Sequence, residues 1–538
     1  MDERVENEAA PAAGSGSAET WLWVLLGLAV ALGIWARFSV YGQTVVADEL
    51  STLWIVQNHG LLDTVRFVTG DGEISPPLYF ILAWFASKLG SAPELIRLPS
   101  MLFAFASLPL FYLLGLRLFN RSAGILATVI AALSPMLVYL GANGRAYSVM
   151  LFFLLATTLA MLYAIDGGKR RWWVLYAVAT ALAMYTHYTC AFILAGQLLW
   201  LLIYVPGDRL KALLANAGAV VLYIPWIPGY LSDSDSPTTP ILEALQGYGF
   251  EAKKLAVEQV LFWQVTAQRW TLADRWDVLL LSAGTLLALV AALVLIARRT
   301  GIVDWFRNLD RGIVLVLVLI FATPVGALLL GRVSTDVFGT RNLAAAWMGI
   351  PLGLGALLVA AGRVWGTIAT GLVVAGLTIG AVGLTDEAKT ELRFKTAAEY
   401  VESQARPGDA VVSTSHLTPV PLSPLDAYLD PDVKDYRLGL PKHDPPFLPG
   451  KTETPDPGAL WEQALADSKR IFVVGVEGAE NLKNDRQLFV NGAYATGLYD
   501  LPPEWKVGEQ HQIDGILPIT VTLLERRNRP SAERTGTP

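Results

Sequence analysis

The chain has 538 residues, of which 53% are hydrophobic and only 16% are charged. This composition is typical of a polytopic membrane protein. The formal net charge of -6 argues against a nucleic-acid partner, because nucleic-acid-binding surfaces are rich in lysine and arginine. The single cysteine, Cys190, excludes a disulfide within the chain and a cysteine metal cluster.

The first twenty residues are acidic and rich in alanine, glycine and serine, so they lack the basic segment of a cleaved signal peptide. We expect residues 1–20 to form a disordered cytosolic tail. The apolar run at residues 21–40 can span a hydrocarbon core of about 30 Å. It is expected to remain as an anchor.

Ten further apolar runs follow, which gives about eleven transmembrane helices by length. They are residues 98–119, 123–140, 147–165, 172–188, 191–205, 213–230, 278–297, 313–330, 343–361 and 365–384. Lysine and arginine gather in alternate loops, which predicts a cytoplasmic N-terminus and an extracytoplasmic C-terminus. Residues 21–385 are therefore expected to form the transmembrane domain, with external loops at 41–96 and 231–277.

Two short helices are expected within the first external loop. Residues 76–89 are apolar but too short for a comfortable crossing, and a crossing there would turn the later basic loops outward. We expect an interfacial or re-entrant helix that begins at Pro76 and Pro77. Residues 48–66 have apolar side chains at helical spacing and are expected to lie along the membrane surface.

Four carboxylates lie in this loop: Asp48, Glu49, Asp71 and Glu73. Acidic groups at a membrane face are costly to keep, so they predict an active site. Asp48 is the candidate general base, and Glu49 or Glu73 could orient it or hold a cation. Helix capping would explain one acid but not four. Asp71 lies between two glycines and is also explained as a turn residue.

A second group of candidate residues is cationic or aromatic and lies at the outer ends of later spans. Its members are Arg145, Tyr147, His187, Arg332 and Arg341. The planar guanidinium of arginine binds phosphate through paired hydrogen bonds, so these residues predict a site for a phosphate-bearing lipid. The alternative is that they anchor the spans at the interface.

Residues 386–528 are expected to form a small α/β domain, because long apolar runs stop and short strand-like and helix-like segments alternate. The expected strands are 410–413, 470–476 and 519–524, and the expected helices include 394–401 and 460–466. Residues 430–457 are rich in proline and predicted to be mostly irregular. Residues 529–538 are expected to be a disordered tail.

The order of these features resembles the GT-C superfamily of integral membrane glycosyltransferases. The nearest branch is the protein O-mannosyltransferase and aminoarabinose-transferase-like group, glycosyltransferase family 39 and relatives. The resemblance rests on Asp48-Glu49, on Glu73 three residues before a Pro-Pro-Leu-Tyr sequence, on an Ala-Leu-Ser-Pro span, and on Arg-x-Tyr at Arg145. Arg341 resembles a late arginine motif of the family. Two positions depart from the family pattern, Ser75 before the prolines and Asn342 after Arg341.

The resemblance implies a polytopic GT-C fold in the plasma membrane and a sugar donor carried on a polyprenyl phosphate. Transfer would occur on the outer face with inversion, to a glycan, lipid or protein acceptor. Arg145 and Arg341 would neutralise the departing phosphate, assisted by Tyr147, Arg332 and His187. Asp48 and Glu73 are the candidate ligands of a divalent cation such as Mg²⁺ or Mn²⁺. The C-terminal domain would recognise or shield the acceptor.

Two other functions remain open from the sequence: a flippase or transporter of lipid-linked sugars, and a relative that binds the lipid without turnover. Transporters often carry internal repeats with interrupted spans, and we see no such repeat in the sequence. Placement of the acids in an external loop favours an enzyme.

Overall fold

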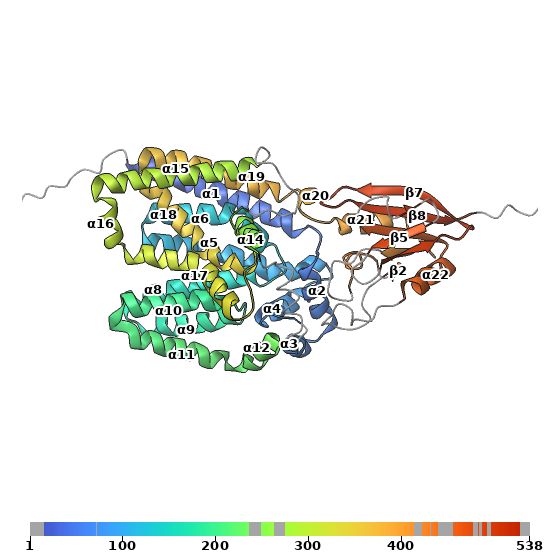
Figure 1. Cartoon of the computed structure of the whole chain (residues 1–538), viewed down its shortest axis with the longest axis horizontal. Helices are drawn as coiled ribbons and strands as arrows, with labels where there is room; N and C mark the ends of the chain where they lie inside the picture. Colours follow the sequence, from blue (N-terminus) through green and yellow to red (C-terminus); the bar gives the residue numbers. More distant parts are fainter. Residues whose placement is uncertain are drawn as a thin grey trace, which may run out of the picture.

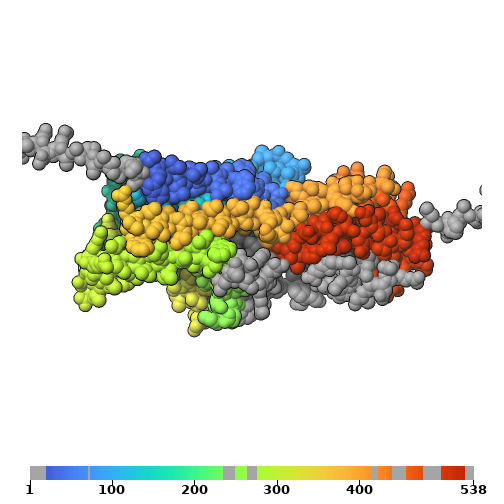
Figure 2. Space-filling model, turned by 90° about the horizontal axis from the view of Figure 1, so that it is seen from above, coloured from blue at the N-terminus to red at the C-terminus, as the bar shows by residue number. Residues whose placement is uncertain are grey.

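The computed structural model describes residues 15–70, 73–235, 249–262, 275–413, 422–430, 432–438, 456–476, 482–483, 487–491 and 496–527. A long helical bundle is joined end-on to a smaller α/β domain at the C-terminal end of the chain (Figures 1 and 2). The expected architecture of a polytopic helical membrane protein with a small α/β domain is confirmed.

The helices of the bundle follow one another along the chain as follows. They are α1 (Ser15–Tyr41), α2 (Asp48–Asn58), α3 (Leu61–Thr69), α4 (Leu78–Ser87), η1 (Pro93–Arg97), α5 (Leu98–Leu118), α6 (Arg121–Leu133), α7 (Pro135–Gly141), α8 (Tyr147–Gly167), α9 (Arg170–Met184), α10 (Cys190–Tyr204), η2 (Pro206–Asp208), α11 (Arg209–Tyr223), η3 (Ile224–Trp226), α12 (Ile227–Asp235), α14 (Phe250–Phe262), α15 (Trp276–Arg299), α16 (Ile302–Arg307), α17 (Arg311–Val333), η5 (Asn342–Met348), α18 (Ile350–Ala360) and α19 (Arg363–Gly383).

Each of the eleven expected spans coincides with one or more of these helices. Within the described residues, eight helices are long and apolar enough to cross a membrane, or nine if the bent pair α6 and α7 is one span. The expected spans at 172–188 and 191–205 form α9 and α10, which have only 15 residues each. The chain is a multi-pass membrane protein.

The expected span at residues 123–140 is broken into α6 and α7, which meet at an angle of 63°. Pro135 starts α7 and has no N–H to donate to the carbonyl of Ala131. Arg37, buried in α1, supplies the missing donor. Its Nη2 donates to Ala131 O at 3.2 Å and its Nη1 to Ala132 O at 2.8 Å. The charged side chain of Arg37 therefore satisfies the carbonyl groups that are left without a donor where α6 ends and α7 begins.

We predict that Arg37→Met lowers the thermal stability of the purified protein, because the buried carbonyl of Ala131 loses its donor. An unsatisfied buried polar group costs about 1–3 kcal/mol. The control is Arg299→Met at the exposed end of α15, which should leave the melting temperature close to that of the wild type. Equal melting temperatures for the two variants would contradict the supporting role of Arg37.

The loop that the sequence predicts to be external contains three short α-helices, α2, α3 and α4, at the end of the bundle that faces the C-terminal domain (Figure 1). The short helix expected at residues 76–89 is confirmed as α4, which has 10 residues and packs on α2 and η1. The single surface helix expected at 48–66 is instead two helices that break near Gly60. The expected loop at 231–277 contains part of α12 and all of α14, and its residues 236–248 and 263–274 lie outside the described part.

The C-terminal domain contains helices α20 (Glu387–Thr390), α21 (Phe394–Gln404) and α22 (Pro457–Asp467). Its strands are β1 (Ala410–Ser413), β2 (Lys434–Arg437), β3 (Arg470–Val476), β4 (Leu482–Lys483), β5 (Gln487–Asn491), β6 (Thr496–Asp500), β7 (Trp505–Ile513) and β8 (Ile519–Arg526). A mixed sheet has the order β2-β1-β3-β8-β7, and a second sheet has the order β4-β5-β6.

The main sheet is parallel between β2, β1 and β3 and antiparallel from β3 to β7. The strands predicted at 410–413, 470–476 and 519–524 are confirmed, and the predicted helix face at 394–401 is buried against the sheet. Residues 430–457 include the four-residue strand β2, whose pairing with β1 the local sequence does not reveal. Because residues 431 and 439–455 lie outside the described part, mostly irregular structure there stays a prediction. The expected tails at 1–20 and 529–538 lie largely outside the described residues, and α1 begins already at Ser15.

Candidate active site

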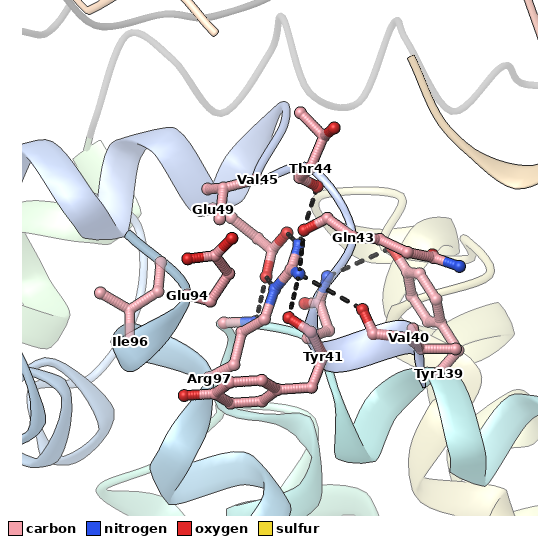
Figure 3. A network of polar contacts seen from close by, with 12 residues as sticks. Val40, Tyr41, Gln43, Thr44, Val45, Glu49, Glu94, Ile96, Arg97 and Tyr139 are labelled. Carbon is pink, nitrogen blue, oxygen red and sulfur yellow. Dashed lines mark hydrogen bonds and ion pairs between the residues drawn. The ribbon is translucent and has the colours of Figure 1, made fainter. Parts of the chain in front are cut away.

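A buried ion pair fixes the backbone around the acidic loop (Figure 3). The Arg97 guanidinium donates to both carboxylate oxygens of Glu49, from Nε at 2.7 Å and from Nη2 at 2.5 Å, and both side chains are only 4% exposed. The backbone N–H of Gly144 also donates to Glu49. A Cβ atom at residue 144 would lie only 2.9 Å from Glu49 Oε1, so glycine permits this close approach.

Arg97 also shapes the chain that connects α1 to α2. Its Nη1 donates to the carbonyls of Tyr41 at 2.9 Å and Gln43 at 2.7 Å, and its Nη2 to that of Thr44 at 2.9 Å. The sequence-based prediction gave Glu49 a catalytic or metal-binding role. The structure places both of its oxygens in this buried network, and it adds Arg97, which the sequence-based prediction missed.

Asp48 follows a strained residue and begins α2. Ala47 has φ 50° and ψ -124°, and it is the one non-glycine residue with positive φ in the described ranges. Strained backbone persists where surrounding contacts hold it, and it is concentrated at functional sites. Placement at a helix N-terminus also favours the ionised form of the Asp48 carboxylate.

Two ion pairs lie side by side at this point of the chain. Asp48 pairs with Arg341, which comes from the segment between α17 and η5, and the two side chains are 39% and 55% exposed. Glu73 forms a bidentate ion pair with Arg145, in which Nη1 donates to Oε2 at 3.0 Å and Nη2 donates to Oε1 at 3.1 Å. Arg145 Nη1 also lies 3.5 Å from the backbone carbonyl oxygen of Asp48 and 3.4 Å from Thr52 Oγ1, so the second pair contacts the first turn of α2.

His187 and Tyr147 lie near Arg145. Their rings are 5.4 Å apart, and His187 Nδ1 is 2.9 Å from Thr189 Oγ1. Burial, and secondarily the charge of Arg145, lowers the pKa of His187 to about 4. At neutral pH His187 is therefore an uncharged ring that can donate or accept a hydrogen bond.

The remaining predicted residues are not joined to this cluster. Arg332 is exposed in the last turn of α17, and none of the described contacts joins it to Asp48 or Glu73. Asp71 lies outside the described residues. The structure thus brings together Asp48, Glu73, Arg145 and Arg341 from distant parts of the sequence.

A divalent cation does not fit the two predicted ligands as they stand. Asp48 and Glu73 each have an arginine partner that balances the carboxylate charge, and a cation would have to lie against two guanidinium groups. Within the described ranges, no group of three or more His, Cys, Asp or Glu side chains could hold a metal ion.

Glu391, between α20 and α21, is a further carboxylate that the sequence-based prediction missed. Its pKa is raised to about 8, mainly by burial and to a smaller extent by charged neighbours. Those neighbours are Glu49 and Glu387, which raise the pKa, and Arg97 and Arg341, which lower it. Glu391 therefore lies within electrostatic range of Arg97 and Arg341.

We predict that Glu391 makes stability fall as pH rises. Its folded pKa of about 8 exceeds the ordinary value of 4.5, so the folded protein holds the proton more tightly than the unfolded chain. The stability contribution is full below the unfolded pKa and is lost as pH rises through the folded pKa. Melting temperatures measured between about pH 5 and pH 9 should fall less in Glu391→Gln than in wild type.

The control for this measurement is Glu399→Gln, an exposed carboxylate on α21. Its melting curve should keep the pH dependence of the wild type. If the melting temperature of Glu391→Gln fell with pH as steeply as that of the wild type, Glu391 would not be the source of the pH dependence.

Comparison with known proteins gives one family match over part of the chain and several structural similarities at low identity. Residues 75–228 match the sequence model of a family described as dolichyl-phosphate-mannose-protein mannosyltransferase, which covers α4 to the start of α12. The match covers less than half of the chain and agrees with the resemblance that the sequence motifs indicate. No curated protein matches the chain.

Three solved structures are similar at low identity. AglB, an oligosaccharyltransferase from Archaeoglobus fulgidus in complex with an inhibitory peptide and a dolichol-phosphate, is 12% identical over 85% of this chain and 70% of that chain, with a TM-score of 0.48. ArnT from Cupriavidus metallidurans is 14% identical over 94% and 98%, with a TM-score of 0.43. The arabinofuranosyltransferase AftD from Mycobacteria is 15% identical over 94% and 40%, with a TM-score of 0.44. At these identities and TM-scores the similarities do not assign a substrate to this chain.

Proposed function

We propose that the chain transfers a monosaccharide from a polyprenyl-phosphate-linked donor to a hydroxyl group of a glycan, lipid or protein acceptor. The observation that carries this proposal is the convergence of Arg145 and Arg341 beside Asp48. Arg341 pairs with the half-exposed Asp48 carboxylate, and Arg145 lies 3.5 Å from the backbone carbonyl of the same residue. Together the two guanidinium groups and the carboxylate would provide an anion site and a base. The family match over residues 75–228 supports transfer of a sugar from a lipid phosphate.

Arg145 and Arg341 would bind the phosphate that joins the sugar to the lipid. Arginine binds phosphate through two parallel hydrogen bonds, and such charge-assisted bonds are stronger than neutral ones. Both arginines are paired with carboxylates in the structure, so donor binding exchanges a carboxylate for a phosphate oxygen at one or both of them. Exchange at Arg341 would release the Asp48 carboxylate close to the donor.

The reaction is a single displacement at the anomeric carbon. The acceptor hydroxyl gives its proton to Asp48 while its oxygen forms the new glycosidic bond. The bond between the anomeric carbon and the phosphate oxygen breaks, and both of its electrons leave with the lipid phosphate. Inversion follows because the acceptor attacks from the side opposite to the leaving group.

Electrostatic stabilisation would come from the same two arginines, because negative charge develops on the departing phosphate. Glu73 would keep Arg145 in position through its two hydrogen bonds. No step is routed through a divalent cation.

The reaction would take place on the extracytoplasmic side of the plasma membrane, in line with the distribution of basic loops. In that orientation the C-terminal domain is also extracytoplasmic and lies beside the acceptor. Entry of the donor from the bilayer would bring its phosphate to the end of the bundle where α2, α3 and α4 lie.

We predict that Asp48→Asn abolishes sugar transfer but keeps donor binding. Removal of a general base lowers the rate by about 10²- to 10⁴-fold. The measurement is release of lipid phosphate from a panel of radiolabelled polyprenyl-phosphate sugars by the purified protein in nanodiscs. Equal release by wild type and Asp48→Asn would assign Asp48 a structural role. Donor binding without release by either protein would favour the flippase or lipid-binding function.

We predict that Arg341→Gln lowers kcat by about 100-fold or more, because a charged donor to the leaving group is lost. The matched control is Arg298→Gln, at the exposed end of α15, which should keep the wild-type rate. Binding of the polyprenyl phosphate alone should also weaken in Arg341→Gln. A normal rate in this variant would remove Arg341 from the phosphate site.

A further inference from the structure

We propose that Tyr428 and Glu387 of the C-terminal region are positioning residues for the base Asp48, which makes this domain part of the catalytic geometry. This inference rests on the proposed role of Asp48. It assigns the domain a second role, beyond recognising or shielding the acceptor.

Glu387 bonds the segment that leads from α1 to Asp48. Its Oε1 accepts hydrogen bonds from the backbone N–H of Thr44 at 2.7 Å and from Thr44 Oγ1 at 2.8 Å. Just before it, Gln43 Nε2 donates to Leu384 O at 2.8 Å. Two consecutive residues of this segment are therefore tied to the chain that enters the C-terminal domain.

Tyr428 bonds the next residue. The backbone N–H of Val45 donates to Tyr428 OH at 2.7 Å. The Tyr428 ring is half-buried and packs against both the apolar cluster of α2 and that of the α/β domain, and Val46 packs against the latter cluster. Lys395 adds an ion pair with Glu94 at 2.7 Å across the same junction.

These contacts end immediately before the strained turn. Only Val46 and Ala47 separate Val45 from Asp48, and Ala47 has φ 50°, which an alanine rarely adopts. A strained residue keeps its conformation only where its surroundings hold it. Arg97 holds the carbonyls on one side of the segment, and Glu387 and Tyr428 hold its N–H groups on the other. The direction of the Asp48 side chain depends on both.

Tyr428→Phe removes the hydroxyl and keeps the ring that packs in the junction. We expect kcat to fall about tenfold, as for a misplaced base, while KM for donor and acceptor stays within about twofold. Thr44→Val removes the hydroxyl that donates to Glu387, and this variant should independently lower kcat as well. Tyr400→Phe is the matched control, since Tyr400 stacks on His511 at 4.0 Å elsewhere in the domain.

Ala47→Gly tests whether the contacts act through the strained turn. Glycine adopts positive φ without the penalty of a Cβ atom, so the turn depends less on its surroundings. Tyr428→Phe should therefore lower kcat much less when it is added to Ala47→Gly than when it is made in the wild type. The double variant should have a kcat close to that of Ala47→Gly alone. A double variant as slow as Tyr428→Phe would overturn the inference.

Asp48→Asn, assayed in parallel, separates failure of the inference from failure of the proposed function. If Asp48→Asn is as active as wild type, the base assignment fails and the inference fails with it. If Asp48→Asn is inactive and Tyr428→Phe has the wild-type kcat, only the inference is overturned. A rise in acceptor KM with unchanged kcat would likewise overturn it and leave the domain a role in acceptor recognition.

Discussion

The buried ion pair between Glu49 and Arg97 is the interaction on which the rest of the site depends. Burying two charges costs several kcal/mol per ion, so such a pair needs good geometry and additional hydrogen bonds. Both are present: the pair has two bonds at 2.5 and 2.7 Å, and Arg97 donates to three further backbone carbonyls at 2.7 to 2.9 Å. The pair thereby fixes the chain between α1 and α2, and the first residue of α2 is Asp48.

Adjacent carboxylates in this loop consequently have different environments. Glu49 is buried and bonded at both oxygens, whereas Asp48 is 39% exposed and has an arginine partner that is itself 55% exposed. An exposed ion pair contributes little stabilising free energy, because water and salt screen it. A phosphate can therefore replace the carboxylate with only a small loss of free energy. The buried pair stabilises the loop, and in the proposed mechanism the exposed pair opens to admit the substrate.

Much of the fold could be predicted from the sequence, because apolar runs and strand-like segments are local signals. Strands at 410–413 and 470–476 match the structure at both ends, and the short α4 was expected from its length. The acids and Arg145 and Arg341 were identified by residue type and motif order. Arg97 and Glu391 were missed, because their roles arise only when distant segments meet. The bend at Pro135 was missed because its support, Arg37, lies in another helix.

The most direct test of the account is a structure of the protein with a bound polyprenyl phosphate, determined in nanodiscs. The account predicts that the phosphate lies between Arg145 and Arg341 and that the Asp48 carboxylate is separated from Arg341 and faces open space beside the phosphate. The pair between Glu49 and Arg97 should be unchanged. A phosphate bound elsewhere, with Asp48 and Arg341 still paired, would contradict the proposed donor site and the role of Asp48 as the base.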